Sequence, residues 1–369
     1  MRVALVHDYL SEFGGAERVL ETLCEMFPKA PIYTAFAVKG STVWKRFKKR
    51  KIIEWRHSWL IKHGKLYSPL RFLAPWIWES FDFDGFDLVI SSASWYITKG
   101  IITRPETTHI CYCHTPPRYL YGYKTAIEWQ RYLPIKIYAH FINNFLRKYD
   151  YLAAQRVDRF VTNSENVKKR IKKFYKREAE VIYPPVNVAE IKQATKNLKP
   201  KDYFLVVSRV VGAKGIDLAI KTANELNIKL KIVGEPAGFR WEEKRLKELK
   251  KDNIEFVGRV SDEELWKLYG KCKAFLALAE DEDFGITPVE AMAAGRPVIA
   301  FRGGGYLETV VEGETGLFFN KATVESLAEA IKNLNDLNHL SFSSSVCRRQ
   351  AEKFSKERFK KEIKKVLDV

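Results

Sequence analysis

The stretch between Glu280 and Pro297 holds the residues whose types and spacing are best suited to chemistry. Four consecutive acidic residues lead into a Phe-Gly turn, a Thr-Pro pair and a run of small residues that ends at Gly295. Two of the carboxylates, Glu282 and Glu290, stand eight residues apart. They could anchor a ligand by hydrogen bonds or work as an acid and base pair. The alternative is that the acidic residues only solvate a loop and favour the start of a helix.

The elements around this stretch predict where it lies in a fold. Apolar runs at residues 274–279 and 297–301 predict two buried strands, joined by a loop and a helix with Pro288 in its first turn. In an open parallel sheet, the loop that leaves the carboxyl end of a strand binds ligands. A helix N-terminus there presents free backbone N–H groups to an anion or a sugar hydroxyl.

A second candidate loop follows the first predicted strand, residues 2–8. Gly14 and Gly15 separate this strand from an amphipathic helix, which is typical of the first unit of a Rossmann-like domain. The loop lacks the Gly-x-Gly-x-x-Gly pattern, so no nicotinamide or flavin cofactor is predicted. Paired glycines let backbone N–H groups approach a phosphate or a sugar, although a tight turn without a ligand explains them equally well.

A third candidate is the segment 114–121, which follows a predicted strand at residues 108–113. Two consecutive prolines fix its backbone. Its polar and aromatic side chains form a possible ligand surface: His114, Arg118, Tyr119 and Tyr121. A lone histidine is more often structural, but its position at a strand end beside Arg and Tyr favours a ligand contact.

Strands alternate with helices along the whole chain and predict an α/β protein with parallel sheets. Pro184-Pro185 is a stiff linker that divides the chain into two Rossmann-like domains, residues 1–183 and 187–343, facing a central cleft suited to two substrates. A helix is predicted at residues 242–251. Further helices at residues 126–156 carry an apolar stripe that favours core packing: Phe141, Phe145, Tyr149 and Leu152.

The composition indicates an anionic partner. The 369 residues carry a net charge of +18, which suits nucleic acid, acidic membrane or a phosphorylated substrate. Residues 39–73 contain eleven Lys/Arg against one acid, interleaved with six aromatic residues, and we expect short helices here. No apolar run is long enough to span a bilayer. Five scattered cysteines are expected to be reduced and structural.

Taken in order, these motifs resemble the retaining glycosyltransferases of family 4, which have the two-domain GT-B fold. The resemblance covers nearly the full length. The motifs that carry it are Gly14-Gly15-Ala16-Glu17, residues 208–215, Phe256-Val257-Gly258, Glu282-x7-Glu290 and residues 304–310. The segment 114–121 is similar to bacterial mannosyltransferases that build O-antigen and related polysaccharides. One departure is Asp283, where many relatives have glycine.

The resemblance implies roles for individual residues. Arg209 and Lys214 would neutralise the diphosphate of a nucleotide sugar, Glu282 would lie beside the donor sugar, Glu290 would accept from the ribose hydroxyls, and His114 would contact the sugar near the reacting carbon. Gly15 would approach the diphosphate from the other domain. Further donor contacts are implied at Gly14, Val257, Gly258, Arg259, Phe284, Gly285, Ile286 and Thr287, and acceptor contacts at Arg118, Tyr119 and Tyr121.

The resemblance also implies the reaction. We expect retaining transfer of mannose from GDP-mannose to a lipid-linked oligosaccharide, without metal or other cofactor, in cell-surface polysaccharide synthesis. We place the protein in the cytoplasm, attached to the inner face of the plasma membrane through residues 39–73, with no nucleic acid partner. A C-terminal helix, residues 344–369, would cross back to the first domain. Alternatives are a UDP- or dTDP-sugar donor, an epimerase or sugar-binding scaffold, and a basic nucleic-acid- or membrane-binding protein without turnover.

Overall fold

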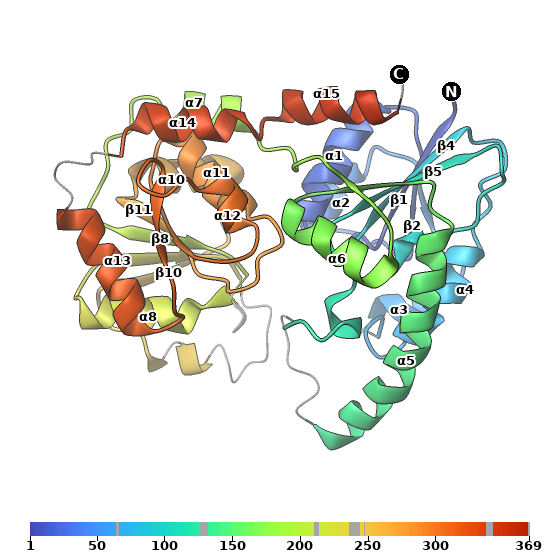
Figure 1. Ribbon diagram of the computed structural model, residues 1–369, viewed down its shortest axis with the longest axis horizontal. Coiled ribbons are helices and arrows are strands. Elements are labelled where there is room, and N and C mark those ends of the chain that lie inside the picture. The colour runs from blue at the N-terminus through green and yellow to red at the C-terminus, as the bar shows by residue number, and fades with distance from the viewer. Residues whose placement is uncertain are drawn as a thin grey trace. The chain divides into compact units, whose positions relative to one another are not determined.

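The computed structural model describes residues 1–63, 66–125, 132–209, 214–235, 244–246, 248–336 and 342–367. The chain divides into two compact units (Figure 1). The first contains Met1–Tyr123, Trp129–Pro185 and Lys360–Val369, and the second contains Lys124–Glu128 and Val186–Phe359.

The first unit is built on a parallel sheet of seven strands. Its strands are β1 (Val3–His7), β2 (Ile32–Thr34), β3 (Ile52–Glu54), β4 (Leu88–Ala93), β5 (Thr108–Cys113), β6 (Arg159–Thr162) and β7 (Glu180–Val181), in the spatial order β3-β2-β1-β4-β5-β6-β7. The central strands β1 and β4 are buried along their whole length, because helices cover both faces of such a sheet. Strand β3 was not predicted: its three partly buried residues, flanked by basic residues, give no clear period.

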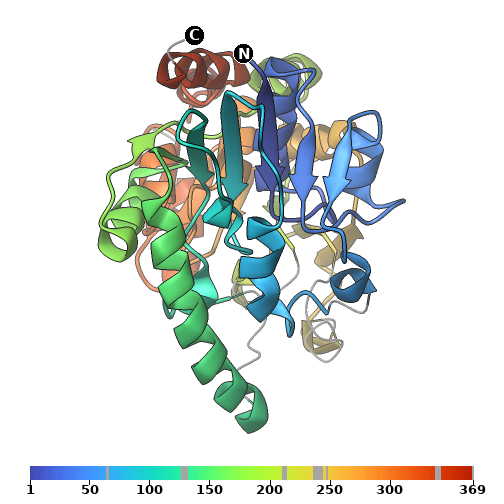
Figure 2. The same cartoon turned by 90° about the vertical axis from the view of Figure 1, so that its right-hand side faces the viewer.

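The helices of this unit differ widely in length. They are α1 (Gly15–Met26), α2 (Thr42–Phe47), α3 (Trp59–Lys62), α4 (Ala74–Glu79), α5 (Leu133–Gln155) and α6 (Glu165–Tyr175), with the short 3-10 turns η2 (Arg71–Leu73), η3 (Thr98–Gly100) and η4 (Arg118–Leu120). In Figures 1 and 2, the N-terminal half of α5 extends beyond the sheet of its own unit. Helix α6 is capped by Ser164, whose hydroxyl accepts from the Val167 N–H at 3.1 Å.

The apolar stripe predicted to pack α5 into the core does not do so. Phe141, Phe145 and Leu152 are exposed, and only Tyr149 of the predicted set is buried. The buried face of α5 is carried by smaller or polar residues, among them Ala139, Leu146 and Ala153. The spacing was therefore correct for one helical face, but that face is turned to solvent.

The second unit repeats the architecture with six parallel strands. Its strands are β8 (Phe204–Val207), β9 (Leu230–Val233), β10 (Ile254–Gly258), β11 (Ala274–Ala277), β12 (Val298–Phe301) and β13 (Gly316–Phe319), in the order β10-β9-β8-β11-β12-β13. Its helices are α7 (Val188–Thr195), α8 (Ile216–Glu225), α10 (Asp262–Lys271), α11 (Ile286–Ala293), α12 (Tyr306–Thr309), α13 (Val324–Asp336) and α14 (Ser344–Glu352). Of the helix predicted at residues 242–251, residues 242, 243 and 247 lie outside the described residues, and residues 244–246 and 248 are helical.

The C-terminal segment is two helices where one was predicted. Helix α14 ends at Glu352, and α15 (Lys356–Val366) begins after an interval of three residues. The break occurs because Phe354 is buried against Phe284 and its carbonyl accepts from the Val186 N–H. Residues from Lys360 onward belong to the first unit, where Ile363 and Val366 pack against the sheet.

Candidate functional site

Each sheet has a point where the strand order reverses, and such points are where open α/β sheets bind ligands. In the first unit the reversal lies between β1 and β4, and in the second between β8 and β11. The polar residues at these strand ends therefore define two half-sites, each described within its own unit.

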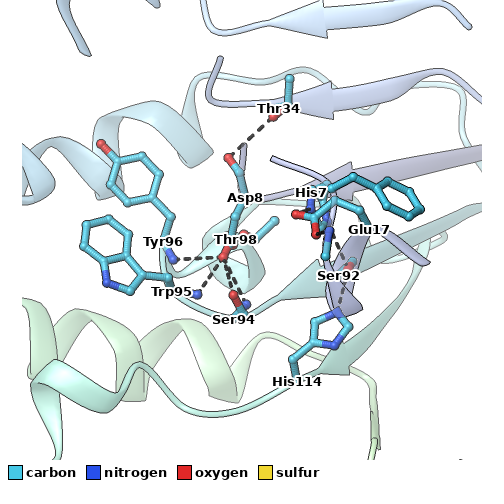
Figure 3. Close-up of polar contacts among 12 residues, drawn as sticks. His7, Asp8, Glu17, Thr34, Ser92, Ser94, Trp95, Tyr96, Thr98 and His114 are labelled. Carbon is cyan, nitrogen blue, oxygen red and sulfur yellow. Dashed lines mark hydrogen bonds and ion pairs between the residues drawn. The ribbon is translucent and has the colours of Figure 1, made fainter. Parts of the chain in front are cut away.

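In the first half-site, four side chains form one hydrogen-bonded chain (Figure 3). Glu17 Oε1 lies 3.2 Å from His7 Nε2, and His7 Nδ1 lies 3.1 Å from Ser92 Oγ. Ser92 Oγ in turn lies 2.9 Å from His114 Nε2. His7 and Ser92 are register partners on adjacent strands, so the sheet itself sets this spacing. His114 is thus connected through Ser92 and His7 to the carboxylate of Glu17 on α1.

The chain of bonds links the tautomers of its two histidines. When His7 donates from Nε2 to Glu17, its Nδ1 accepts from the Ser92 hydroxyl. Ser92 then accepts from His114 Nε2–H, and the His114 Nδ1 is left as an acceptor. Burial lowers the pKa of His114 to about 3, so this imidazole is neutral at ordinary pH. A neutral, oriented imidazole is suited to bind a sugar hydroxyl.

Asp8 organises the loop beside this chain of hydrogen bonds, a role that was not predicted from the sequence. Its carboxylate accepts from the backbone N–H groups of Ser94, Trp95 and Tyr96 at 3.2, 2.6 and 3.2 Å, and from the Thr98 hydroxyl. Desolvation by burial raises the pKa of Asp8. The same loop holds Ile97 at φ 59°, a strained conformation for a β-branched residue, which these bonds stabilise.

The paired glycines lie at the start of α1 in the same half-site. The N–H of Gly14 donates to Glu17 Oε2 at 2.8 Å, so this donor is already used within the protein. Gly15 is exposed at the first position of the helix. Glu17 therefore has two partners, one on each carboxylate oxygen: the Gly14 backbone and the His7 ring.

The second half-site brings two of the predicted residues into contact. The Lys214 ammonium lies 2.6 Å from Glu282 Oε2, with both side chains partly exposed. Lys214 precedes Gly215, which has φ 68° and lies so close to Leu278 that a Cβ would meet that residue at 2.9 Å. The glycine thus brings the loop after β8 against the end of β11. Burial and the Glu282 carboxylate beside it raise the pKa of Tyr306 well above its usual range.

Two further glycines pack closely against the backbone of the acidic loop that contains Glu282. A Cβ at Gly304 would lie 2.3 Å from the carbonyl oxygen of Glu282, and one at Gly305 would lie 2.3 Å from Phe284 Cα. The N–H of Gly305 donates to that same Glu282 carbonyl at 2.9 Å. Backbone packing this close is open only to glycine, which explains the Gly-Gly pair at this position.

Both strand-order reversals thus carry groups that are able to bind a phosphate or a sugar. Comparison with known proteins shows the family to which the chain belongs. Residues 13–190 match the family described as Glycosyltransferase Family 4, and residues 187–358 match Glycosyl transferases group 1. The chain belongs to glycosyltransferase family 4.

Individual relatives and structures agree with this glycosyltransferase assignment. An uncharacterised glycosyltransferase of Methanocaldococcus jannaschii is 30% identical over 177 residues, which are 48% of this chain and only 49% of that protein. The alpha-1,3/1,6-mannosyltransferase ALG2 of Dictyostelium discoideum is 26% identical over 302 residues, 69% of each protein. Anabaena HepE, solved in complex with UDP-glucose, has a TM-score of 0.74 at 16% identity and is covered in full, which confirms the predicted GT-B fold.

In this glycosyltransferase, Glu290 and Phe284 are less accessible than their predicted donor contacts require. Glu290 is 1% exposed, and its Oε2 accepts from the Tyr269 hydroxyl at 2.9 Å. The Phe284 ring packs on Phe354 in the core, so only its backbone could touch a ligand. Contact of Glu290 with a ribose remains a prediction, and it requires the carboxylate to become accessible.

The remaining predicted donor residues lie at neighbouring strand ends of the glycosyltransferase. Arg209 is exposed directly after β8, while residues 210–213 of that motif lie outside the described residues. Val257 and Gly258 end β10, where Gly258 has φ 78° and interrupts the register with β9. Arg259 is exposed and pairs with Glu235 at 3.4 Å. Ile286 and Thr287 open α11 directly after Gly285, so their N–H groups have no partner within the helix.

The residues predicted to bind an acceptor have different surroundings. The Tyr121 hydroxyl donates to Asp150 Oδ2 at 2.7 Å, and its ring stacks on Phe174. The Tyr119 ring contacts Trp95 at 5.1 Å between centroids. Arg118 is partly buried in η4. The hydroxyl of Tyr121 is therefore already hydrogen-bonded within the protein, and any contact with an acceptor would use the Tyr121 ring.

Proposed function

We propose that this glycosyltransferase transfers mannose from GDP-mannose to a lipid-linked oligosaccharide with retention of anomeric configuration. The observation that carries the transfer chemistry is the Lys214–Glu282 pair, 2.6 Å apart at the strand-order reversal of the second unit. An ammonium there would stabilise the negative charge that develops on a departing diphosphate. No resident metal is required for that role.

The proposed step moves one bond and one proton. The bond between the anomeric carbon and the phosphate oxygen breaks, and its electron pair stays on the diphosphate of GDP. The acceptor hydroxyl oxygen forms the new bond to the same face of the sugar, and its proton passes to a phosphate oxygen of the leaving group. Lys214 and Arg209 would hold the diphosphate, and Glu282 and His114 would orient the sugar through its hydroxyl groups.

Mannose is supported by two observations. The relative from Dictyostelium discoideum is named a mannosyltransferase. The segment 114–121 resembles bacterial mannosyltransferases of polysaccharide synthesis. The lipid-linked acceptor fits the net charge of +18, because a phosphorylated lipid is anionic.

We further propose attachment to the inner face of the plasma membrane. In the segment 39–73, Lys45, Arg46, Lys48 and Lys49 are exposed on or beside α2. Its aromatic residues support attachment less than the sequence suggested. Phe47 and Trp55 are core residues, whereas Trp59 is exposed. Within the described residues, no helix has the length and apolar character to cross a bilayer.

Thermal-shift measurements with GDP-mannose, UDP-glucose and dTDP-glucose test the donor. We expect GDP-mannose to raise the melting temperature and to be consumed when a lipid-linked glycan is added. Stabilisation by UDP-glucose alone would overturn the GDP-mannose assignment. Stabilisation without any turnover would favour a sugar-binding scaffold.

A further inference from the structure

The most exposed apolar surface among the described residues lies on one face of α5. Leu133, Ile137, Phe141 and Phe145 follow one another at intervals of four, and Leu152 falls seven residues later. Residues at these intervals share one helical face. Phe141 is 68% exposed and Leu152 58%. Single exposed apolar residues are ordinary, but a continuous stripe along a 23-residue helix marks an interaction surface.

The stripe continues onto the neighbouring helix. The exposed Trp76 on α4 lies 6.4 Å from the Phe145 ring, measured between centroids. Arg71 Nη2 donates to Asn143 Oδ1 at 3.1 Å on the buried side of α5. These contacts hold the middle of α5 against its own unit while the apolar face stays exposed.

The charges along α5 select the partner. Lys136, His140 and Arg147 lie along one flank of the stripe, and Lys148 lies within it. Asp150 is the helix's one acidic residue, and it is fully buried, paired with Lys99. The exposed face is therefore mainly apolar, with one cation, Lys148, within it and further cations along one flank. A second copy docked there by two-fold symmetry would bring like charges together, and a nucleic acid would leave the apolar stripe in water.

A groove next to the stripe offers a place for a phosphate. It has a volume of about 550 Å³ and lies between α5 and α6, lined by Tyr121, Asn144, Arg147, Lys148, Tyr151 and Phe174. Two cations, an amide and aromatic rings are typical of the interfacial depth of a bilayer, where phosphates and acyl chains meet.

We propose that α5 docks on an anionic lipid surface, with its apolar stripe among the acyl chains and Lys136, Arg147 and Lys148 at the lipid phosphates. This assigns membrane contact to α5 in addition to the segment 39–73. The biological role of this α5 contact rests on the proposed function, because a lipid-linked acceptor is found at a membrane. Docking itself is measured independently of sugar transfer.

Flotation of the full chain with vesicles tests this surface. We compare vesicles of phosphatidylcholine alone with vesicles that contain about 30% phosphatidylglycerol. This anionic lipid gives the vesicles a negative surface like that of a natural anionic leaflet. The chain should float with the anionic vesicles, and the double variant Ile137→Ser/Phe141→Ser should lower the partition coefficient at least about tenfold. The matched control is Ile102→Ser, because Ile102 is 51% exposed and Ile137 is 53% exposed in the same unit.

The charge contribution needs its own pair of variants. Lys136→Gln/Lys148→Gln should weaken binding to anionic vesicles and reduce its salt dependence, whereas Lys361→Gln/Lys364→Gln on α15 should not. Equal flotation of the α5 variants and their controls would overturn the proposal. So would a wild-type dimer in sedimentation that the Ile137→Ser/Phe141→Ser change dissociates, since α5 would then cover a second copy.

A thermal-shift measurement with GDP-mannose separates this proposal from the proposed function. The α5 variants should bind the donor as the wild type does, because none of these residues lies at a strand-order reversal. Failure of the wild type to bind any nucleotide sugar would remove the proposed function and leave the vesicle result standing. Failure of flotation alone would remove only the docking surface.

Discussion

The two half-sites of this glycosyltransferase are built in opposite ways. In the first unit, buried side chains are joined in a chain of hydrogen bonds from Glu17 to His114. In the second, a partly exposed ion pair of Lys214 and Glu282 rests on glycines packed against backbone. Under the proposed function, the difference would suit the two parts of a nucleotide sugar: a neutral, oriented surface for sugar hydroxyls, and a positive charge for a diphosphate that gains charge during transfer.

Removal of the Lys214 charge should have the largest effect. Lys214→Ala should lower turnover by about 10²–10³-fold, because a cation aimed at developing charge contributes on that scale, while the melting temperature stays near that of the wild type. Lys221→Ala, at an exposed position of α8, the helix that follows Lys214, is the control. Near-normal turnover of Lys214→Ala in steady-state kinetics would remove its assigned role.

The glycine support can be broken without touching any charge. Gly304→Ala places a Cβ 2.3 Å from the Glu282 carbonyl oxygen and should cost about 3 kcal/mol of stability, from the clash and the left-handed backbone together. Gly313 also has positive φ, but its Cβ would meet nothing within 4 Å, so Gly313→Ala should cost only about 1 kcal/mol. Urea unfolding of both variants makes the comparison, and equal losses would show that the close packing contributes nothing.

The hydrogen-bonded chain of the first unit should respond to a single hydroxyl. Ser92→Ala disconnects His114 from His7 and Glu17 and should lower kcat/KM about tenfold, by loss of the imidazole's preferred tautomer. Ser91→Ala is matched to it: Ser91 is also buried and bonds a histidine, His109, at 2.8 Å, but on the other face of the strand. If both variants lose activity equally, the effect comes from the strand and not from the chain of bonds.

The buried histidines also predict how stability depends on pH. Burial lowers the pKa of both His109 and His114 to about 3, whereas a histidine in the unfolded chain titrates near pH 6.5. Between these values the unfolded state binds more protons, so stability falls as pH is lowered from about 6.5 toward 3. His109→Gln should reduce that slope by at most about 1.4 kcal/mol per pH unit. An unchanged slope in urea titrations from pH 7 to pH 4 would contradict the burial effect.

The sequence predicted the parallel sheets and the strand ends at which the candidate sites lie, because apolar runs and glycine turns are local signals. The family motifs placed Lys214 and Glu282 at neighbouring strand ends, and the ion pair between them is visible only in the structure. The roles of His7, Ser92 and Asp8 were not predicted. His7 and Ser92 meet through the register of β1 with β4, and Asp8 bonds the loop after β4, which is far from it in the chain. The exposure of Phe141 also escaped, since helical spacing defines a face and does not say whether protein or solvent meets it.

Calorimetric binding of GDP and of GDP-mannose to two variants tests the division of work between the half-sites most directly. Lys214→Ala should weaken GDP and GDP-mannose alike, because both carry the diphosphate. His114→Ala should leave GDP affinity unchanged and weaken GDP-mannose by about tenfold, one lost hydrogen bond to the sugar. If His114→Ala weakens both ligands equally, or Lys214→Ala weakens neither, the two halves do not divide the donor in this way.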